Sequence, residues 1–246
     1  MKIIASYNIK GGVGKTAAAV NLSYLAAAEG GTTLVWDLDP QGAASFYFRV
    51  NPKIKMGGSG LLRRKRALDK VIKATEYPKL DLVPADFSYR KMDRVLERLR
   101  KPCDRLHKMI KPMGGEYDYV FIDCPPGISL VSENVFKAAD VLLIPTIPTP
   151  LSLRTLERLA AFTRKKDYRH VQLLPFFSMF DSRKKLHREI VKHPPRRMGR
   201  FLDDVVPYAS VVEQMGTLRA PLEVFAPRSP AAGAYRGLWQ ELKSNL

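Results

Sequence analysis

A glycine-rich run near the start of the chain has the residue types needed to hold phosphate groups. It reads Lys10-Gly11-Gly12-Val13-Gly14-Lys15-Thr16. Three glycines in four positions let the backbone bend so that successive N–H groups converge on one anion. Lys15 can reach the β- and γ-phosphates of a nucleotide, and the Thr16 hydroxyl can hold Mg²⁺. We therefore expect nucleotide contacts along this run and at Ala17. The alternative is a glycine-rich turn with two solvated lysines.

The segments that flank this run have the patterns of a strand and a helix. Apolar residues 3–7 suit a buried strand, and alanine-rich residues 16–29 predict a helix that stops at Gly30 and Gly31. A strand, a glycine loop and a helix N-terminus direct the backbone amides and the helix dipole at the same phosphates. This local order agrees with a phosphate loop.

A pair of aspartates follows the next apolar run. Residues 34–42 place Asp37 at the end of a predicted strand and Asp39 in a loop that Pro40 and Gly42 force. Because open α/β sheets bind ligands beyond the carboxyl ends of their strands, we expect both carboxylates near the phosphates. Asp37 is expected to support the site. For Asp39, the alternative is a helix-capping residue followed by a turn.

A third aspartate ends the apolar strand predicted at residues 119–122. Asp123 is followed by Cys124, Pro125, Pro126 and Gly127. A magnesium ion bound with nucleotide phosphates needs a carboxylate that approaches from a rigid platform, and a strand end supplies one. Asp123 is therefore a candidate Mg²⁺ ligand beside Thr16. The prolines and glycine that follow it are expected to begin a loop that senses the γ-phosphate.

Strand-like apolar runs alternate with longer helical stretches, which predicts an α/β fold. This alternation is typical of a doubly wound, mainly parallel sheet with helices on both faces. The expected strands are residues 3–7, 33–37, 80–83, 119–122, 141–144 and 171–176, and a short piece ending at Val206. We expect a helix at residues 89–100 and the least ordered stretch at residues 51–66. The length of 246 residues favours a single domain, 1–246.

The composition gives a formal net charge of +17, which points toward a polyanionic partner. Charge alone does not choose between nucleic acid, an anionic membrane surface and mere solubility. No apolar stretch approaches the roughly 18 to 20 residues of a membrane span, and no signal peptide is evident, so we expect no stable membrane insertion and a cytoplasmic protein. Cys103 and Cys124 have no disulfide or zinc spacing.

The positive charge is densest between Arg183 and Arg200, where Glu189 is the only acid. If residues 184–192 are helical, Lys184, Lys185, Arg188 and Lys192 share much of one face, which suits phosphates along a DNA duplex. Nothing in the region reads base edges, so we expect nonspecific binding. The alternative is a solvated helix face. Further candidates for DNA contact are Arg219 and the basic run at residues 63–66.

Taken in order, these motifs resemble those of the ParA/MinD family of ATPases. The second lysine of the phosphate loop, Lys10, matches the deviant Walker A signature, and the DPQG and D-x-P-P segments after the two strands match the partition ATPases. The resemblance implies a deviant Walker P-loop NTPase fold and a dimer with two ATP molecules at its interface, where Lys10 crosses to the partner's nucleotide. It also implies that Asp39 helps to activate water or to organise the metal shell.

Residue roles follow from the same resemblance. Lys10, Lys15 and Asp39 are expected to be catalytic, Thr16, Asp39 and Asp123 to place Mg²⁺, and Met179, Asp181, Pro207 and Tyr208 to surround the adenine. The resemblance also implies slow ATP hydrolysis, binding to the nucleoid, and a small adaptor that stimulates hydrolysis. The cargo stays open among a plasmid, a chromosome, a chemoreceptor cluster and a carboxysome-like compartment, the last as in carboxysome-positioning members.

Two other classes remain as alternatives. A MinD-like regulator at a membrane surface would need an apolar, amphipathic tail. We expect the final helix to pack against the sheet instead. An electron carrier of the nitrogenase-reductase type would need two cysteines per subunit for a bridging iron–sulfur cluster. Cys124 instead occupies the variable position of the D-x-P-P motif that resembles the partition ATPases.

Overall fold

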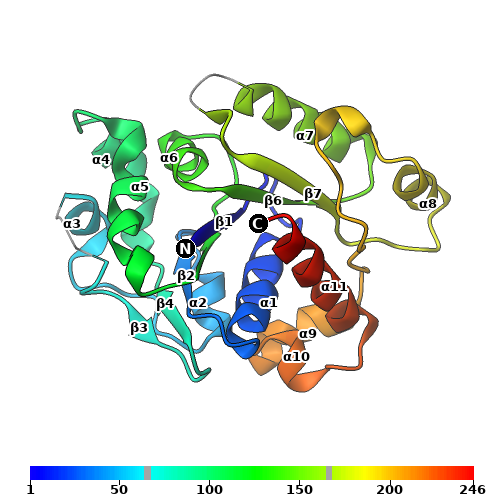
Figure 1. Cartoon of the computed structure of the whole chain (residues 1–246), viewed down its shortest axis with the longest axis horizontal. Coiled ribbons are helices and arrows are strands. Elements are labelled where there is room, and N and C mark those ends of the chain that lie inside the picture. Colours follow the sequence, from blue (N-terminus) through cyan, green and yellow to red (C-terminus); the bar gives the residue numbers. More distant parts are fainter. Residues whose placement is uncertain (64–67, 165–167) are drawn as a thin grey trace.

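The computed structural model describes residues 1–63, 68–164 and 168–246, and within them the chain is built around one seven-stranded sheet (Figure 1). The strand order is β3-β4-β2-β5-β1-β6-β7. The strands are β1 (Lys2–Ser6), β2 (Thr33–Asp37), β3 (Lys73–Ala74), β4 (Leu80–Val83), β5 (Tyr119–Asp123), β6 (Val141–Thr146) and β7 (Gln172–Phe177). The predicted α/β fold class is confirmed.

All neighbouring strands are parallel except β3, which pairs antiparallel with β4 at one edge. The central strands are buried on both faces, as their continuous apolar runs require. In the register of β2 with β5, Asp37 lies beside Asp123, and in the register of β1 with β5, Ser6 lies beside Asp123. The sheet therefore brings two carboxylates from distant sequence positions to one edge.

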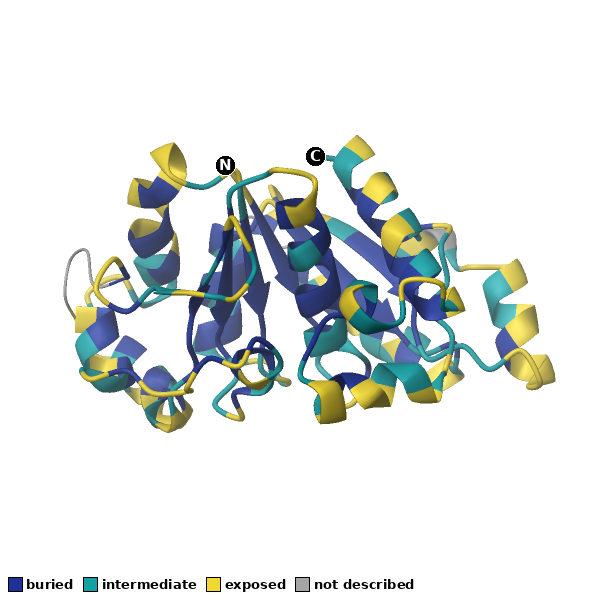
Figure 2. Cartoon of the chain, turned by 90° about the horizontal axis from the view of Figure 1, so that it is seen from below, coloured by how far each residue is buried: buried dark blue, intermediate teal, exposed yellow. Residues whose placement is uncertain are grey.

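Helices cover both faces of the sheet, and each layer has its own hydrophobic core (Figure 2). One layer contains α1 (Lys15–Ala28), α2 (Ala43–Tyr47), α9 (Ser210–Leu218), α10 (Leu222–Phe225) and α11 (Pro230–Ser244). The other contains α3 (Gly57–Arg63), α4 (Met92–Leu96), α5 (Arg105–Ile110), α6 (Leu130–Ala138) and α7 (Pro150–Thr163). Short 3₁₀ turns occupy Phe87–Lys91, Pro102–Asp104, Lys111–Gly115 and Arg196–Met198.

Helix α8 (Lys185–Lys192) stands apart at one end of the molecule, whereas α3, α4 and α5 lie at the opposite end (Figure 1). Its buried residue is His187, whose Nδ1 accepts a hydrogen bond from the Asp181 backbone N–H at 3.1 Å. None of the helices described is long and apolar enough to cross a membrane.

Three local predictions differ from the structure. The piece ending at Val206 is not a strand: Val206 bonds to the backbone of Phe177 and Phe180, but the pairing amounts to one isolated parallel bridge between Phe180 and Pro207. The helix expected at residues 89–100 divides into a 3₁₀ turn and α4, which ends at Leu96. Part of the stretch expected to be least ordered forms α3, where Leu61 and Leu62 are buried. Arg64, Lys65 and Arg66 of the basic run lie outside the described residues.

Candidate nucleotide site

The glycine-rich run joins β1 to α1 as a tight loop, in the position that the sequence predicts. Gly14 is the N-cap of α1 and has φ +96°, in the left-handed region that favours glycine. A Cβ at Gly14 would also lie 2.8 Å from the Ser178 Oγ. The Ser6 hydroxyl at the end of β1 donates to the Lys15 carbonyl at 2.8 Å, so the loop is tied to the strand before it. The N-terminus of a fourteen-residue helix thus faces the loop.

The two lysines of the loop have different surroundings. Lys15 is only 6% exposed, and its Nζ donates to the Lys10 carbonyl oxygen at 3.0 Å. Burial lowers the pKa of Lys15, while the nearby Asp123 opposes that shift. The Lys10 side chain reaches instead toward α7, where its Nζ lies 3.5 Å from the Ser152 Oγ. Lys15 therefore lines the cavity beside its own loop, whereas Lys10 is not among the residues that line it.

Asp123 is fully buried, and neither of its carboxylate oxygens makes a well-formed hydrogen bond within the part of the chain that the structure describes. Burial raises the pKa of Asp123 well above its ordinary value, and Asp37 adds to the shift; Thr16 and Lys15 oppose it. A buried carboxylate of this kind is costly unless a cation or a proton compensates it. Its position beside Thr16 fits Mg²⁺, which uses one or two carboxylates together with substrate phosphates.

Asp37 has a different environment from its neighbour in the sheet. One of its oxygens accepts hydrogen bonds from the Ser45 backbone N–H at 2.7 Å and from the Ser45 hydroxyl at 2.6 Å. Burial raises the pKa of Asp37 to about 6, against the effect of these bonds. The Ser45 hydroxyl also accepts from the Ala85 N–H at 2.9 Å. Asp37 thereby fixes the start of α2, and its expected support of the site remains a prediction.

Asp39 lies in the loop after β2 and lines the cavity in front of the phosphate loop. Asp39 is half-buried, and its Oδ1 accepts a hydrogen bond from the Gln41 N–H at 3.0 Å within a local turn. The loop after β5 is tied to the phosphate loop from the other side, since Gly127 N–H donates to the Ile9 carbonyl at 3.0 Å and the Tyr7 hydroxyl donates to the Gly127 carbonyl at 2.7 Å. The loops after β2 and β5, two strands that each end in an aspartate, therefore both lie beside the phosphate loop.

The cavity beside these residues has a volume of about 470 Å³. Met179, Pro207 and Tyr208 line it, together with most of the phosphate loop. Asp181 is not part of this lining: its carboxylate makes two 2.9 Å hydrogen bonds to the Arg183 guanidinium, which holds the pKa of Asp181 at about 2. Sequence reasoning missed several other lining residues. They are Tyr47 of α2, Val212 and Glu213 of α9, Tyr235 of α11, and Ser178 directly after β7.

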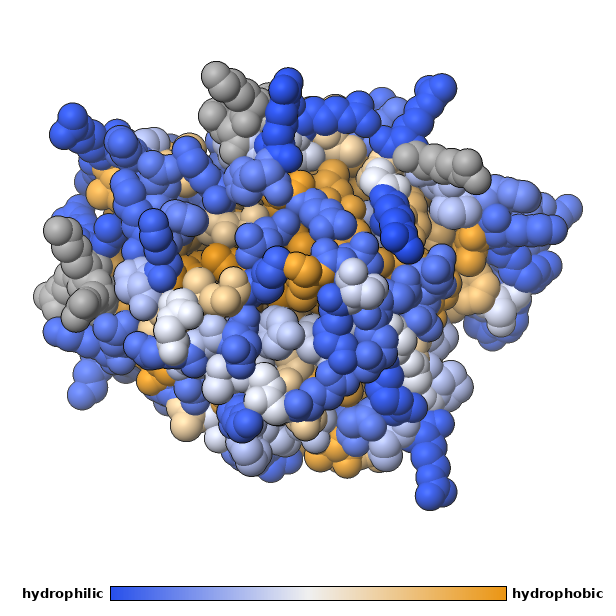
Figure 3. Space-filling model, in the orientation of Figure 1, coloured by the Kyte–Doolittle hydropathy of each residue, from blue (hydrophilic) through white to orange (hydrophobic). Residues whose placement is uncertain are grey.

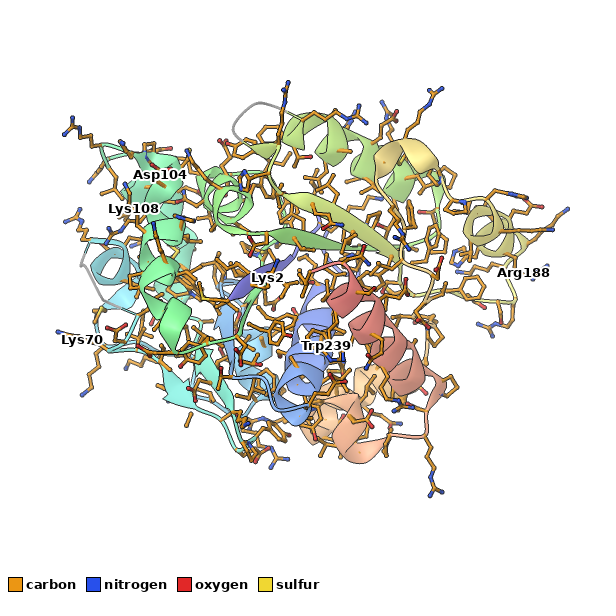
Figure 4. All side chains as sticks on the ribbon, viewed as in Figure 1. Lys2, Lys70, Asp104, Lys108, Arg188 and Trp239 are labelled. Carbon is orange, nitrogen blue, oxygen red and sulfur yellow. The ribbon has the colours of Figure 1, made fainter. Side chains whose placement is uncertain are left out.

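The basic residues predicted to meet DNA occupy α8 and the turn before it. Arg183 and Lys185 are 83% and 84% exposed as side chains, although Arg183 pairs with Asp181 and Lys185 lies 3.8 Å from Glu189. Arg188 donates to the Ser182 carbonyl at 2.6 Å and lies at the edge of the molecule (Figure 4). Figure 3 shows hydrophilic side chains at both ends of this face, with apolar atoms gathered toward its centre.

Arg219 is not part of the α8 surface. It follows α9 with φ +50°, its Nε donates to the Phe46 carbonyl at 3.0 Å, and its guanidinium lies 4.5 Å from the Phe46 ring centroid. These contacts join α9 to α2, beside the Tyr47 wall of the cavity. Arg219 therefore lies near the nucleotide cavity rather than on the α8 surface.

Comparison with known proteins agrees with this geometry. A family model described as an AAA domain matches residues 1–173. The chromosome partitioning protein ParA of Myxococcus xanthus is 30% identical over 252 residues, which cover 98% of this chain and 87% of that protein. The chain belongs to the ParA family of ATPases. The family predicted from the motifs is thus confirmed.

Solved structures share the fold of this ParA-family chain. The ATP complex of a substituted McdA from Cyanothece has a TM-score of 0.79 at 20% identity, covering 97% of this chain and 96% of that one. Cobyrinic acid a,c-diamide synthase from Mycobacterium smegmatis, with bound ADP and magnesium, has a TM-score of 0.81 at 22% identity, covering 98% and 94%. The same architecture therefore serves proteins with different activities, and the site must decide the function.

Proposed function

We propose that this chain, as a single ATPase domain over residues 1–246, hydrolyses Mg-ATP in a dimer that binds DNA nonspecifically and positions a cargo. The observation that carries the proposal is the cavity that joins the phosphate loop, Asp39 and the loop at Pro207, next to Asp123, whose buried carboxylate oxygens have no well-formed hydrogen bond among the described residues. Membership of the ParA family supports the same reading. The ATP and ADP complexes among its structural neighbours support the choice of nucleotide.

In this proposal the phosphate loop, with Gly11, Gly12, Val13 and Ala17 beside its named side chains, binds the triphosphate through backbone N–H groups. Lys15 would neutralise the β- and γ-phosphates, and Thr16 and Asp123, with Asp39 nearby, would hold Mg²⁺. Mg²⁺ would add further positive charge beside the phosphates. Asp39 orients the attacking water, so that catalysis depends on positioning and electrostatics rather than on a covalent step.

The adenine would lie against Met179, Pro207 and Tyr208 at the side of the cavity away from the phosphate loop. Tyr208 is 55% exposed, and an aromatic ring at the mouth of a pocket can cover a base. Asp181, which the sequence grouped with these residues, does not line the cavity, and it would approach the adenine only if its ion pair with Arg183 opened. Lys10 would reach the nucleotide of a second copy, since its side chain does not line the cavity of its own chain.

The DNA surface would be α8 with the turn before it, through Arg183, Lys184, Lys185 and Arg188. Dimerisation places two copies of this surface on one assembly, which makes weak contacts additive on the same duplex. Such a protein would reside in the cytoplasm, on the nucleoid. An adaptor that stimulates hydrolysis would couple the cycle to the cargo.

The direct test is binding of fluorescent ATP with and without Mg²⁺. Lys15→Ala should weaken binding by at least about 100-fold, because a buried phosphate charge loses its partner. Asp123→Asn should remove the enhancement by Mg²⁺ and leave weak, metal-independent binding. Lys70→Ala is the matched control, since Lys70 is exposed at the far end of the molecule (Figure 4). ATP binding that is indifferent to both site substitutions would refute the proposed function.

A further inference from the structure

A second cationic surface lies at the end of the molecule opposite α8. We call it the arginine surface and define it as Lys91, Arg94, Arg98, Arg100 and Lys101, on α4 and the turns on either side of it. All five residues are exposed. The labelled Asp104 and Lys108 mark this end in Figure 4, and Arg188 marks the other. The nucleotide cavity is lined by none of the five, so the proposed ATPase activity does not account for them.

Two acids of the same segment are engaged within the protein. Asp93 accepts a hydrogen bond from the Val131 N–H at 2.9 Å, at the start of α6. Asp104 pairs with Lys137 at 2.8 Å and with Lys108 at 3.8 Å. The third acid, Glu97, is exposed among the five cations, and a single carboxylate leaves most of their charge uncompensated. The net positive charge of this segment therefore faces solvent.

Arg94 and Arg98 have no ion-pair partner among the residues that the structure describes. In the described ranges, no carboxylate lies within 4.0 Å of the guanidinium nitrogens of Arg94 or Arg98. An ionised guanidinium presents five N–H donors in a fixed plane that matches a carboxylate. Both side chains are therefore available to carboxylates of a partner.

Two crevices lie on the arginine surface, and each has one apolar residue in a lining that is otherwise polar or charged. One has a volume of about 260 Å³ and lies between α3 and α4, where Arg94, Val95 and Arg98 line it. The other, of about 410 Å³, is lined by Leu99, Arg100 and Lys101 with residues of α5. Val95 and Leu99 are partly buried and pack against the core of this layer. Each crevice thus offers an apolar contact surrounded by guanidinium and ammonium groups.

An exposed aromatic residue extends the same surface. Phe87 is 61% exposed, and the Arg90 guanidinium stacks 4.0 Å from its ring centroid. Aromatic and arginine side chains are enriched at protein–protein interfaces, where apolar anchors occupy pockets with a polar rim. On α8, by contrast, Lys185 projects into solvent at 84% exposure, an arrangement that suits a phosphate backbone. The two basic ends of the molecule therefore differ in what they can recognise.

We infer that the arginine surface binds an acidic, amphipathic segment of another protein. Carboxylates of that segment would pair with Arg94 and Arg98, and its apolar side chains would cover Val95 and Leu99. DNA carries the negative charge to pair with the arginines but has no apolar side chains to contact Val95 and Leu99. An acidic, amphipathic peptide can make both kinds of contact. None of the five residues lines the nucleotide cavity or belongs to α8, so the inference does not depend on the proposed DNA surface.

The test uses the full chain with Mg-ATP present throughout, the condition in which duplex binding is expected, and fluorescence anisotropy with three labelled probes. One is a synthetic peptide with glutamates and leucines at helical spacing, the second has serine in place of each leucine, and the third is a DNA duplex. Arg94→Glu with Arg98→Glu is compared with the matched reversal Arg188→Glu with Lys192→Glu on α8. Each pair has the same spacing and the same change of charge. Arg94→Gln with Arg98→Gln replaces the first pair if that variant fails to fold.

The leucine-containing peptide should bind at least about tenfold more tightly than the serine peptide, and the reversal at Arg94 and Arg98 should weaken it at least about tenfold. The α8 reversal should change peptide affinity by less than about twofold while it weakens duplex binding. Equal affinity for the two peptides, or an unchanged affinity after loss of Arg94 and Arg98, would overturn the inference. Duplex binding that depends on Arg94 and Arg98 and displaces the peptide would also overturn it, and would identify a second DNA surface.

Discussion

The nucleotide pocket and helix α8 are two charged regions at opposite extremes of burial. Asp123 is completely buried and Lys15 is 6% exposed, whereas the side chains of Arg183 and Lys185 are more than four-fifths exposed. A charge fixed in a low-dielectric site interacts strongly with one partner, but an exposed charge is screened and acts together with its neighbours. Single substitutions should therefore have large effects in the pocket, and α8 should respond to combined charge and to salt.

The largest effect is expected at Lys10. Lys10→Ala should lower the rate of ATP hydrolysis by at least about 1,000-fold, as when a cation supplied across an interface is removed from phosphoryl transfer. ATP binding should fall by no more than about threefold, because Lys15 serves the loop of its own chain. Steady-state hydrolysis and nucleotide titration measure the two quantities. A hydrolysis rate like that of the unchanged protein would show that Lys10 is only a solvated lysine.

The second effect concerns Asp39, which lines the cavity and accepts a hydrogen bond within a local turn. Asp39→Ala should lower hydrolysis by about 100-fold, since its contribution is made at the transition state. ATP binding should persist, and an ATP-loaded dimer should accumulate. Light scattering after gel filtration with Mg-ATP detects that dimer. If the variant loses nucleotide binding and forms no dimer, Asp39 has a structural or metal-holding role instead.

A third prediction applies to the exposed region. Reversal of charge at Arg183, Lys185 and Arg188 should weaken DNA binding by at least about 30-fold at low salt and reduce the slope of log affinity against log salt. ATP binding should be unchanged, because the three side chains do not line the cavity. Each of the three single reversals should have a much smaller effect. DNA binding that survives the triple reversal would direct attention to Arg219, which lies near the nucleotide end.

The smallest effect is a pH dependence in the docking of α8. Burial lowers the pKa of His187 from 6.5, and the neighbouring Lys184 lowers it further, so the neutral ring accepts the bond from Asp181 N–H. Because the unfolded segment takes up a proton first, this contribution is complete above about pH 6.5 and is lost as the pH falls below it. Hydrogen exchange of residues 181–192, corrected for intrinsic rates, should show less protection at about pH 5.5 than at about pH 7.5. Helix α11, which contains no histidine, is the internal control. Equal protection of α8 at both values would contradict this role.

Sequence patterns predicted the buried part of the molecule better than its edges. The bounds of β2 and β4 match the prediction, because a glycine or lysine before each strand and a loop-forming proline within a few residues after it mark where the strand residues begin and end. Strand β3 was missed because two residues at an antiparallel edge carry no periodic signal. Helix α4 is shorter than its pattern because Arg98 and Leu99 already bond to residues three positions earlier, in a tightened turn.

The site divides in the same way. Lys15, Thr16 and Asp123 could be placed from local motifs, since each follows a strand or loop whose geometry is nearly fixed. The far walls of the cavity, Tyr47 and Tyr235, belong to helices that reach the site only through tertiary packing, and no local pattern marks them. The ion pair of Asp181 with Arg183 was not predicted either. The sequence does not show whether an aspartate pairs with a neighbouring arginine or faces a ligand.

The measurement that tests the central claim most directly is DNA binding as a function of nucleotide. The central claim is that the buried pocket controls the exposed α8 surface through dimerisation. Anisotropy of a labelled duplex is measured with Mg-ATP, with Mg-ADP and without nucleotide, at one fixed salt concentration. The account predicts tight binding only with Mg-ATP, insensitive to DNA sequence and lost at high salt. Equal binding in all three conditions would contradict it, because α8 would then act without the pocket.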